Sequence, residues 1–223
     1  MDKVLEEIKR IASKYKNINK VILFGSRARG DNTPKSDYDI AIVSNNLLES
    51  DRCSFLNEVE DIETLNKIDL IFVHERHKNT EIYENILRDG VEIVNKFDNK
   101  RTNYKNALLG LHESLEESKE NDSLTVRDGV IQRFEFTAEL AWKTMREYLL
   151  LQEITEINSP KSVLSEAFNN NVITDDSGWL QILRDRNSTS HIYDEESAAD
   201  IYERISTRHI HLFDNLLDVL SQK

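Results

Sequence analysis

Two short apolar runs, separated by a polar stretch, place the strongest limit on how this chain can fold. Residues 21–24 read Val-Ile-Leu-Phe, and residues 40–43 read Ile-Ala-Ile-Val. Continuous apolar runs of this length, bounded by turn-forming residues, are typical of buried β-strands. Between them lie a Gly-Ser pair, a short basic segment that can open a helix, and a loop that contains Pro34. The pattern predicts two strands joined by a polar connection.

Two carboxylates stand at the start of the second run. Asp37 and Asp39 are two residues apart. Side chains alternate between the two faces of a strand, so both carboxylates are expected on one face. They repel each other there unless a positive group lies between them. Mg²⁺ meets that need, because it takes oxygen ligands from one or two carboxylates together with substrate phosphates.

The Gly-Ser pair, Gly25 and Ser26, follows the first run directly. Backbone N–H groups at a turn that leads into a helix favour phosphate oxygens. One local unit therefore offers a phosphate cradle and a metal clamp. The alternative interpretation is a glycine turn followed by surface acids at the start of a strand.

These residues resemble the nucleotidyltransferase superfamily of DNA polymerase beta, in its small bacterial form. The family pattern is Gly-Ser, ten residues and then Asp-x-Asp, which Gly25, Ser26, Asp37 and Asp39 match. A third carboxylate is expected on a later strand, and Asp69 is the candidate. The resemblance implies that Asp37, Asp39 and Asp69 are the catalytic and metal-binding residues.

The same resemblance implies a nucleoside triphosphate, ATP or another, as the substrate and Mg²⁺ as the cofactor. The outer phosphates would rest on Gly25 and Ser26, and Arg27, which also fits the family, would join them in binding the nucleotide. In-line attack on the α-phosphorus would transfer NMP and release pyrophosphate, in a two-metal scheme. Asp69 would complete the second metal site and help to deprotonate the acceptor hydroxyl.

Residues 1–97 alternate between helical and strand patterns, which predicts an α/β nucleotidyltransferase domain with a small mixed sheet. Amphipathic helices are marked by apolar residues at helical spacing. The segment 67–73 alternates poorly and is expected to be buried on both sides. Helices are expected over 3–16, 53–66 and 79–89, and strands over 20–25, 37–44, 67–73 and 91–94.

The second half of the chain, residues 101–223, predicts an all-α helical bundle. A polar segment at 97–103 is expected to be a linker, and no convincing strand follows it. Ser159 before Pro160 marks one helix start, because Ser caps helices and Pro suits the first helical position. Helices are expected over 103–119, 124–152, 160–169, 177–186 and 195–221.

Charge and cysteine content exclude some classes of function. The net charge is −12. Residues 101–223 carry 13 Lys and Arg against 22 Asp and Glu, and such acidity opposes the phosphate neutralisation that a processive polymerase needs. Cys53 is the single cysteine, so no internal disulfide forms and a reducing cytoplasm is expected. No signal peptide or membrane-spanning run is evident, so no membrane partner is expected.

A second polar constellation lies between two expected helices. Arg186 can bind a phosphate bidentately, His191 can act as an acid or a base near neutral pH, and Tyr193 offers a hydroxyl that can accept a transferred group. The alternative is a solvated interhelical corner with Asn187 as a helix cap.

Arg186, His191 and Tyr193 are similar to the Arg, four residues, His-x-Tyr motif of HEPN domains. Together with residues 131–143, they resemble the nucleotidyltransferase substrate-binding branch of that group. The resemblance implies a helical bundle that commonly dimerises, so a homodimer is expected. Some relatives are metal-independent ribonucleases that use the Arg and His. In some paired systems the nucleotidyltransferase adds AMP to the Tyr and silences the nuclease.

The leading hypothesis is a nucleotidyltransferase that transfers NMP, with AMP from ATP favoured, to an acceptor presented by the helical domain. The rival is a toxin–antitoxin-like fusion, in which the helical domain cleaves or binds RNA and is regulated by AMP transfer to Tyr193. The acceptor stays open among a protein hydroxyl, RNA and a small molecule such as an aminoglycoside. A non-catalytic nucleotide-binding scaffold is a further alternative.

Other polar and aromatic residues are interpreted as structural rather than functional. His74 and His77 follow the third expected strand without a third metal ligand at suitable spacing. Trp142 is expected in the core, and Glu139 and its neighbours on a charged helix face. His209 on the last helix is expected to face solvent or the edge of the core.

Overall fold

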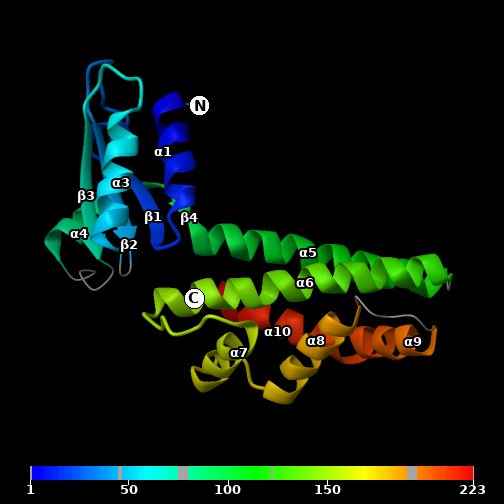
Figure 1. Ribbon diagram of the computed structural model, residues 1–223. Helices are drawn as coiled ribbons and strands as arrows, with labels where there is room; N and C mark the ends of the chain where they lie inside the picture. Colours follow the sequence, from blue (N-terminus) through cyan, green and yellow to red (C-terminus); the bar gives the residue numbers. More distant parts are fainter. Residues whose placement is uncertain (1, 45–46, 75–79, 122, 190–194, 223) are drawn as a thin grey trace. The chain divides into compact units, whose positions relative to one another are not determined.

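The computed structural model describes residues 2–44, 47–74, 80–121, 123–189 and 195–222. The chain divides into two compact units, Met1–Lys96 and Phe97–Lys223. The first unit contains the sheet, and the described part of the second contains helices and turns (Figure 1). This confirms the predicted fold class, an α/β unit followed by a helical one. No helix among the described residues is both long enough and apolar enough to span a membrane.

The sheet of the first unit is mixed and has the strand order β3-β2-β1-β4. The central pair, β1 (Ile18–Phe24) and β2 (Tyr38–Ser44), is formed by the two apolar runs and is antiparallel. The outer strands are β3 (Ile68–His74), parallel to β2, and β4 (Val91–Asn95), antiparallel to β1.

The two faces of the sheet bury alternate residues of the same strands. On one face, Val21, Leu23, Ile40 and Ile42 pack with the apolar sides of two helices, α1 (Lys3–Lys14) and α3 (Glu49–Glu60). On the other face, Ile22, Ala41, Val43 and Val73 pack with Tyr83 and Ile86 of α4 (Glu81–Asp89). The two helical layers therefore cover opposite faces, as period-two alternation requires.

Two predictions for the first unit are wrong in detail. The segment expected to be buried on both sides is β3, which lies at the edge of the sheet, and Ile71 is 39% exposed. The helix expected over 53–66 runs from Glu49 to Glu60 instead. Local pattern does not reveal which strand lacks an outer neighbour, because that depends on the strand order.

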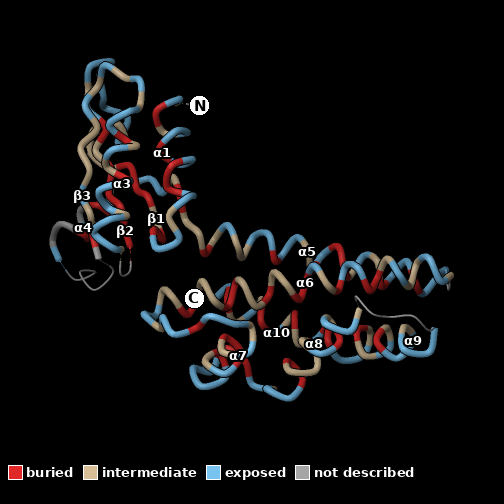
Figure 2. The backbone as a smooth tube through the Cα atoms, viewed as in Figure 1, coloured by how far each residue is buried: buried red, intermediate tan, exposed pale blue. Residues whose placement is uncertain are grey.

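The second unit is built around two long helices, α5 (Lys96–Glu120) and α6 (Leu124–Leu151). Buried positions recur along both (Figure 2). The polar segment expected as a linker is the first part of α5, and Phe97 is buried against Tyr148 with ring centroids 5.8 Å apart. One buried aromatic residue thus holds a polar segment in the helix.

Shorter helices complete the second unit. The last helix was expected to run unbroken over 195–221, but a π-helical turn, η3, interrupts it. A π turn inserts an extra residue into the helical repeat and changes which side chains face the core. The elements are α7 (Pro160–Asn169), α8 (Asp176–Ser188), α9 (Glu195–Arg204), η3 (Ile205–His209) and α10 (Ile210–Ser221).

Candidate active site

Gly25 stands where β1 ends and a short helix, α2 (Gly25–Arg29), begins. Its φ is +70°, which side chains disfavour, and a Cβ there would lie 2.9 Å from Cγ of Asp39 and clash with its carboxylate. In the sheet, Phe24 pairs with Asp39. The glycine therefore brings the start of the turn against the carboxylate, which places the expected phosphate cradle beside the expected metal ligand.

Two of the predicted carboxylates are direct neighbours. Asp39 of β2 and Asp69 of β3 are paired in the parallel register, so their side chains share one face. Asp37, two residues before Asp39, precedes β2 and is exposed. Asp39 lies two residues before Ala41 and four before Val43, so its side chain is on the same face of β2. The three acids therefore belong to the face that α4 covers. We call Asp37, Asp39 and Asp69 the acid cluster.

The acid cluster is electrostatically coupled. Burial raises the pKa of Asp39, and the charges of Asp69 and Asp37 raise it further, while Arg29 and Lys67 oppose the shift. A carboxylate whose pKa is raised by like charges gains from a bound cation. The structure thus brings together the three acids that the sequence predicted.

Lys67 is a member of this site that the sequence interpretation missed. Its ammonium group forms an ion pair with the carboxylate of Asp69, two residues along the chain. The hydrogen bond and charge of Asp69 raise the pKa of Lys67, and Asp37 and Asp39 add to the effect. The spacing of Lys67 and Asp69 could have predicted this contact, because residues two apart in an extended segment share a face.

Arg27 holds the loop that carries Asp37. Its Nε donates to the carbonyls of Ser36 and Asp37, each at 3.1 Å, and Nη2 donates to Ser36 at 2.7 Å. Its guanidinium carbon also lies 3.8 Å from the centre of the Tyr38 ring. The predicted contact of Arg27 with a nucleotide stays a prediction, whereas its hold on the loop is direct.

Asn66 supports the same loop. Its amide Nδ2 donates to the carbonyls of Pro34 at 2.8 Å and Ser36 at 2.9 Å. No motif marked Asn66 in the sequence, because its partners are about thirty residues away in the chain. Together, Arg27 and Asn66 position the backbone between the Gly-Ser turn and the acids.

The acid cluster has the donor chemistry that Mg²⁺ prefers, since carboxylate oxygens are its usual protein ligands. As the side chains stand, no group of three or more His, Cys, Asp and Glu among the described residues is arranged to hold a metal ion. Among the described residues, the ammonium group of Lys67 forms an ion pair with Asp69. The residues fit a divalent cation that replaces this contact.

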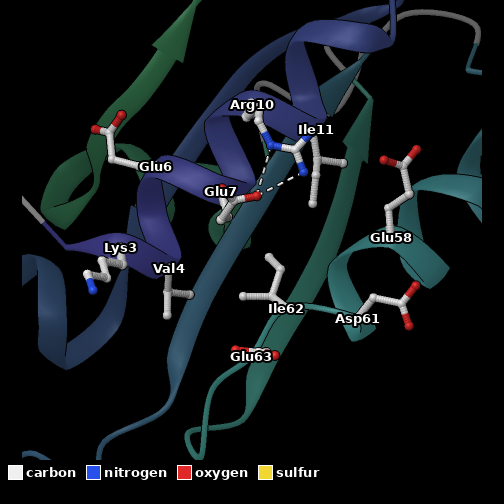
Figure 3. Close-up of a pocket in the computed structure, with 10 residues that line it drawn as sticks. All are labelled: Lys3, Val4, Glu6, Glu7, Arg10, Ile11, Glu58, Asp61, Ile62 and Glu63. Carbon is white, nitrogen blue, oxygen red and sulfur yellow. Dashed lines mark hydrogen bonds and ion pairs between the residues drawn. The ribbon is translucent and has the colours of Figure 1, made fainter.

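A cavity of about 550 Å³ lies elsewhere in the first unit (Figure 3). It is lined by residues of α1, α3 and the segment after α3, which cover the face opposite the acid cluster. Its carboxylates are Glu6, Glu7, Glu58, Asp61 and Glu63, against the cations Lys3 and Arg10. Such a lining repels a triphosphate, so the cavity is not the nucleotide site.

In the helical unit, Arg186 of α8 belongs to a charged cluster. Its Nη2 donates to Oε2 of Glu139 at 2.9 Å, the same oxygen that accepts from Trp142 Nε1 at 2.9 Å. Lys143 lies 2.8 Å from the other oxygen. Burial alone would raise the pKa of Glu139, but the hydrogen bonds from Lys143 and Trp142 outweigh it, so the pKa is lowered.

The predicted Arg186 is therefore bound to Glu139 on α6. The sequence analysis had placed Glu139 only on a charged helix face. Arg186, Trp142 and Lys161 also line a cavity of about 180 Å³. His191 and Tyr193, the other predicted residues of this motif, lie outside the described residues.

A buried ionic network lies next to Arg186 in the sequence. Asp185 accepts from Arg204 Nε and Nη2, both at 2.9 Å, and lies 2.7 Å from His209 Nε2. His209 is completely buried and stacks on Phe134. The prediction that His209 faces solvent or the edge of the core is wrong, because its ring stacks on Phe134 and contacts the buried Asp185.

Two family models match the chain. Residues 6–99 match the model described as polymerase beta, nucleotidyltransferase, and residues 99–222 match the model described as nucleotidyltransferase substrate binding protein like. The second match covers more than half of the chain. The chain belongs to the nucleotidyltransferase substrate-binding family, and its first unit is a polymerase beta nucleotidyltransferase domain. It is therefore a nucleotidyltransferase joined to a substrate-binding domain.

Different segments of the chain are similar to two named proteins. Over 85 residues the chain is 39% identical to the probable ribonuclease HepT of Haemophilus influenzae, covering 36% of the chain and 58% of that protein. The chain thus spans less than two thirds of this relative. Over 73 residues it is 42% identical to a protein of Methanocaldococcus jannaschii that carries the provisional name of protein adenylyltransferase, covering 30% of the chain and 70% of the relative.

A solved structure shows a fold like that of the substrate-binding domain. It comes from Haemophilus influenzae and is described as the fold of a substrate binding domain of a nucleotidyltransferase. The TM-score is 0.50 and the identity 27%, and the match covers 55% of this chain and 99% of the other.

Proposed function

We propose that this chain is a protein adenylyltransferase that transfers AMP from ATP to Tyr193 of the helical unit. The observation that carries the proposal is the close approach of the Gly25 backbone to Asp39, beside the paired Asp69. It joins a phosphate-binding turn to a cluster of carboxylates. The 42% identity to a protein named as a protein adenylyltransferase supports AMP as the group and a protein as the acceptor.

The acid cluster would hold Mg²⁺, which supplies charge neutralisation for the triphosphate and for the attacking oxygen. The Gly25–Ser26 backbone receives the outer phosphates, and Arg27 keeps the loop in place through the carbonyls of Ser36 and Asp37. Mg²⁺ and ATP are both plentiful in the cytoplasm, where we place the protein.

The transfer replaces a phosphoanhydride bond of ATP with a phosphate ester bond to tyrosine. The hydroxyl oxygen of Tyr193 forms a bond to the α-phosphorus of ATP, and the bond from that phosphorus to the pyrophosphate oxygen breaks. The hydroxyl proton passes to the carboxylate of Asp69. Pyrophosphate leaves with the electron pair of the broken bond, and the product is an AMP ester of tyrosine.

Incubation with Mg²⁺ and ATP labelled at the α-phosphate, followed by peptide mass spectrometry, tests the proposal. We expect an added AMP mass on the peptide that contains Tyr193. The label should be lost in Tyr193→Phe and in the double variant Asp37→Ala/Asp39→Ala. Label on another residue, or transfer only to an added aminoglycoside or RNA, would contradict Tyr193 as the acceptor while leaving nucleotidyl transfer in place.

RNA cleavage by the helical unit is a second candidate function. The observation that favours it is Arg186, fixed by Glu139 at 2.9 Å, in a motif shared with ribonucleases. The similarity to a probable ribonuclease points the same way. We expect the transfer-deficient variant Asp37→Ala/Asp39→Ala to cleave single-stranded RNA without added metal, and Arg186→Ala or His191→Ala in that background to stop cleavage. Intact RNA with the transfer-deficient variant would exclude this activity.

We also propose that the protein forms a homodimer through its helical unit. Leu109 of α5 and Phe136 of α6 are 57% and 61% exposed. We expect a second copy of the helical unit to cover these two side chains, because exposed apolar patches mark protein–protein interaction sites. Light scattering should give twice the mass of one chain for the wild type and a single-chain mass for Phe136→Glu.

A further inference from the structure

The acid cluster contains a cation supplied by its own chain. Lys67 directly precedes β3 and lies two residues before Asp69, so the two side chains share a face. The ammonium group of Lys67 is ion-paired with an oxygen of Asp69. Asp69 is in turn paired in register with Asp39. A positive group thus occupies the cluster in which a divalent ion is expected.

The influence of Lys67 extends beyond Asp69. Asp37 and Asp39 both act on the ammonium group and add to the rise in its pKa, after the larger effect of Asp69. In return, Lys67 lowers the pKa of Asp39, against burial and the two neighbouring acids that raise it. All three carboxylates of the cluster therefore interact with this one ammonium group.

The two nearby arginines have other partners. Arg27 donates to the carbonyls of Ser36 and Asp37, and Arg29 pairs with Asp31 at 3.2 Å. Arg29 also lowers the pKa of Asp39, but its guanidinium is engaged on the loop. Of these three cations, Lys67 is the one that directly contacts a carboxylate of the cluster.

We propose that Lys67 is a positioning residue that stands in for the divalent cation in the metal-free enzyme and withdraws when the ion binds. The inference rests on the proposed function, because it needs the acid cluster to be the metal site. The side chain of Lys67 is 70% exposed, so its ammonium group can move into water on a flexible four-carbon stem. The ion then takes the oxygen that Lys67 releases.

Such competition makes Lys67 a determinant of metal affinity. An exposed ion pair is only weakly stabilising, because water surrounds both charges. Removal of the charge should therefore tighten binding of a divalent ion by up to about fivefold. Salt screens exposed charges, so the difference in metal affinity between the variant and the wild type should decrease at high ionic strength.

Binding of Mn²⁺ to the undivided chain of 223 residues, monitored through the electron paramagnetic resonance signal of the free ion, measures this effect without any catalytic step. The variant is Lys67→Met, and the matched control is Lys35→Met, which removes an exposed lysine from the loop before Asp37. We expect Lys67→Met to bind Mn²⁺ more tightly than the wild type, by up to about fivefold. Lys35→Met and the charge-conserving Lys67→Arg should bind like the wild type.

The outcomes separate this inference from the proposed function. Equal or weaker Mn²⁺ binding by a folded Lys67→Met protein overturns the role of Lys67, while the proposed function stands if Asp39→Asn abolishes binding. If the wild type itself binds no Mn²⁺, or Asp39→Asn binds like the wild type, the acid cluster is not the metal site and both proposals fail. Circular dichroism of each variant establishes that it is folded.

Discussion

Gly25 and Gly30 have nearly the same backbone conformation but different surroundings. Their φ angles are +70° and +78°. A Cβ at Gly25 would meet the carboxylate of Asp39, whereas a Cβ at Gly30 would have no atom within 4 Å. Both glycines avoid backbone strain, but Gly25 alone of the two also keeps room for a carboxylate of the acid cluster.

This contrast predicts different effects for two alanine substitutions. Gly25→Ala should abolish AMP transfer, because the new methyl group displaces Asp39, and should cost more unfolding free energy than Gly30→Ala. Gly30→Ala should cost only the backbone strain, about 1 kcal/mol, and keep transfer. Urea unfolding and the labelled-ATP assay measure both effects. Equal activity in the two variants would contradict the close approach of Gly25 to Asp39.

Asp185 shows how a buried charge can be held in the helical unit. Burial alone would raise the pKa of Asp185, but hydrogen bonds from His209, Arg204 and Gln181 outweigh it and lower the pKa to about 2. A carboxylate with a lowered pKa adds stability that is complete above the ordinary value of 3.8. That stability is lost as the pH falls towards 2.

Acid titration of stability should reveal this contribution. We expect Asp185→Asn to lower the unfolding free energy at neutral pH by about 2 kcal/mol and to flatten its dependence on pH between about 4 and 2. Asp218→Asn, an exposed position on α10, is the control and should change neither. Urea unfolding at several pH values gives the free energies. An unaltered pH slope in Asp185→Asn would show that the network does not hold the charge.

At the scale of the element, α7 illustrates a helix start that local residues specify. Ser159 Oγ accepts from the backbone N–H of Ser162 at 3.1 Å, and Ser162 Oγ accepts from the backbone N–H of Ser159 at 3.0 Å. Pro160 follows at the first helical position. These contacts satisfy N–H groups that have no partner within the helix.

Removal of this cap should destabilise the helical unit. We expect Ser159→Ala to lower the unfolding free energy by about 1 kcal/mol, because it leaves the N–H of Ser162 without its acceptor. Ser165→Ala, at an exposed position within α7, should have no effect or a slight stabilising one, since Ala favours helix. Thermal melting of both variants gives the comparison, and an equal melting temperature would contradict the capping role.

At the scale of the whole molecule, the two units have separate cores, and the boundary between them lies at Lys96 and Phe97. A helical unit that began at residue 101, as the polar segment predicts, would lack the first residues of α5. The ring contact of Phe97 with Tyr148 would then be absent. The hydroxyl of Thr144 would also lose its acceptor, the carbonyl of Lys100 at 3.2 Å.

Two fragments test the boundary. The fragment 97–223 should fold on its own, and 101–223 should be less stable by about 2 kcal/mol, the gain from burying one large aromatic side chain. Its melting temperature should be lower by about 5–10 °C. Calorimetry of both fragments makes the comparison, and equal melting temperatures would place the effective boundary after Lys100.

Local pattern was sufficient for much of this protein. The apolar runs that became β1 and β2, the carboxylates two residues apart and the cap at Ser159 all depend on neighbours in sequence. The long amphipathic helices were also predictable, because burial of one helical face repeats every three or four residues. Spacing and resemblance also predict the three acids of the cluster, without the strand register.

The tertiary structure decided the features that depend on distant partners. Strand order placed β3 at an edge and set Asp69 beside Asp39. Contacts between segments far apart in the chain directed Asn66 to the carbonyls of Pro34 and Ser36 and buried His209 against Asp185. A charge or a ring can be read from the sequence, but its neighbours are determined by packing, and the neighbours decide whether it binds a ligand, holds a loop or is buried.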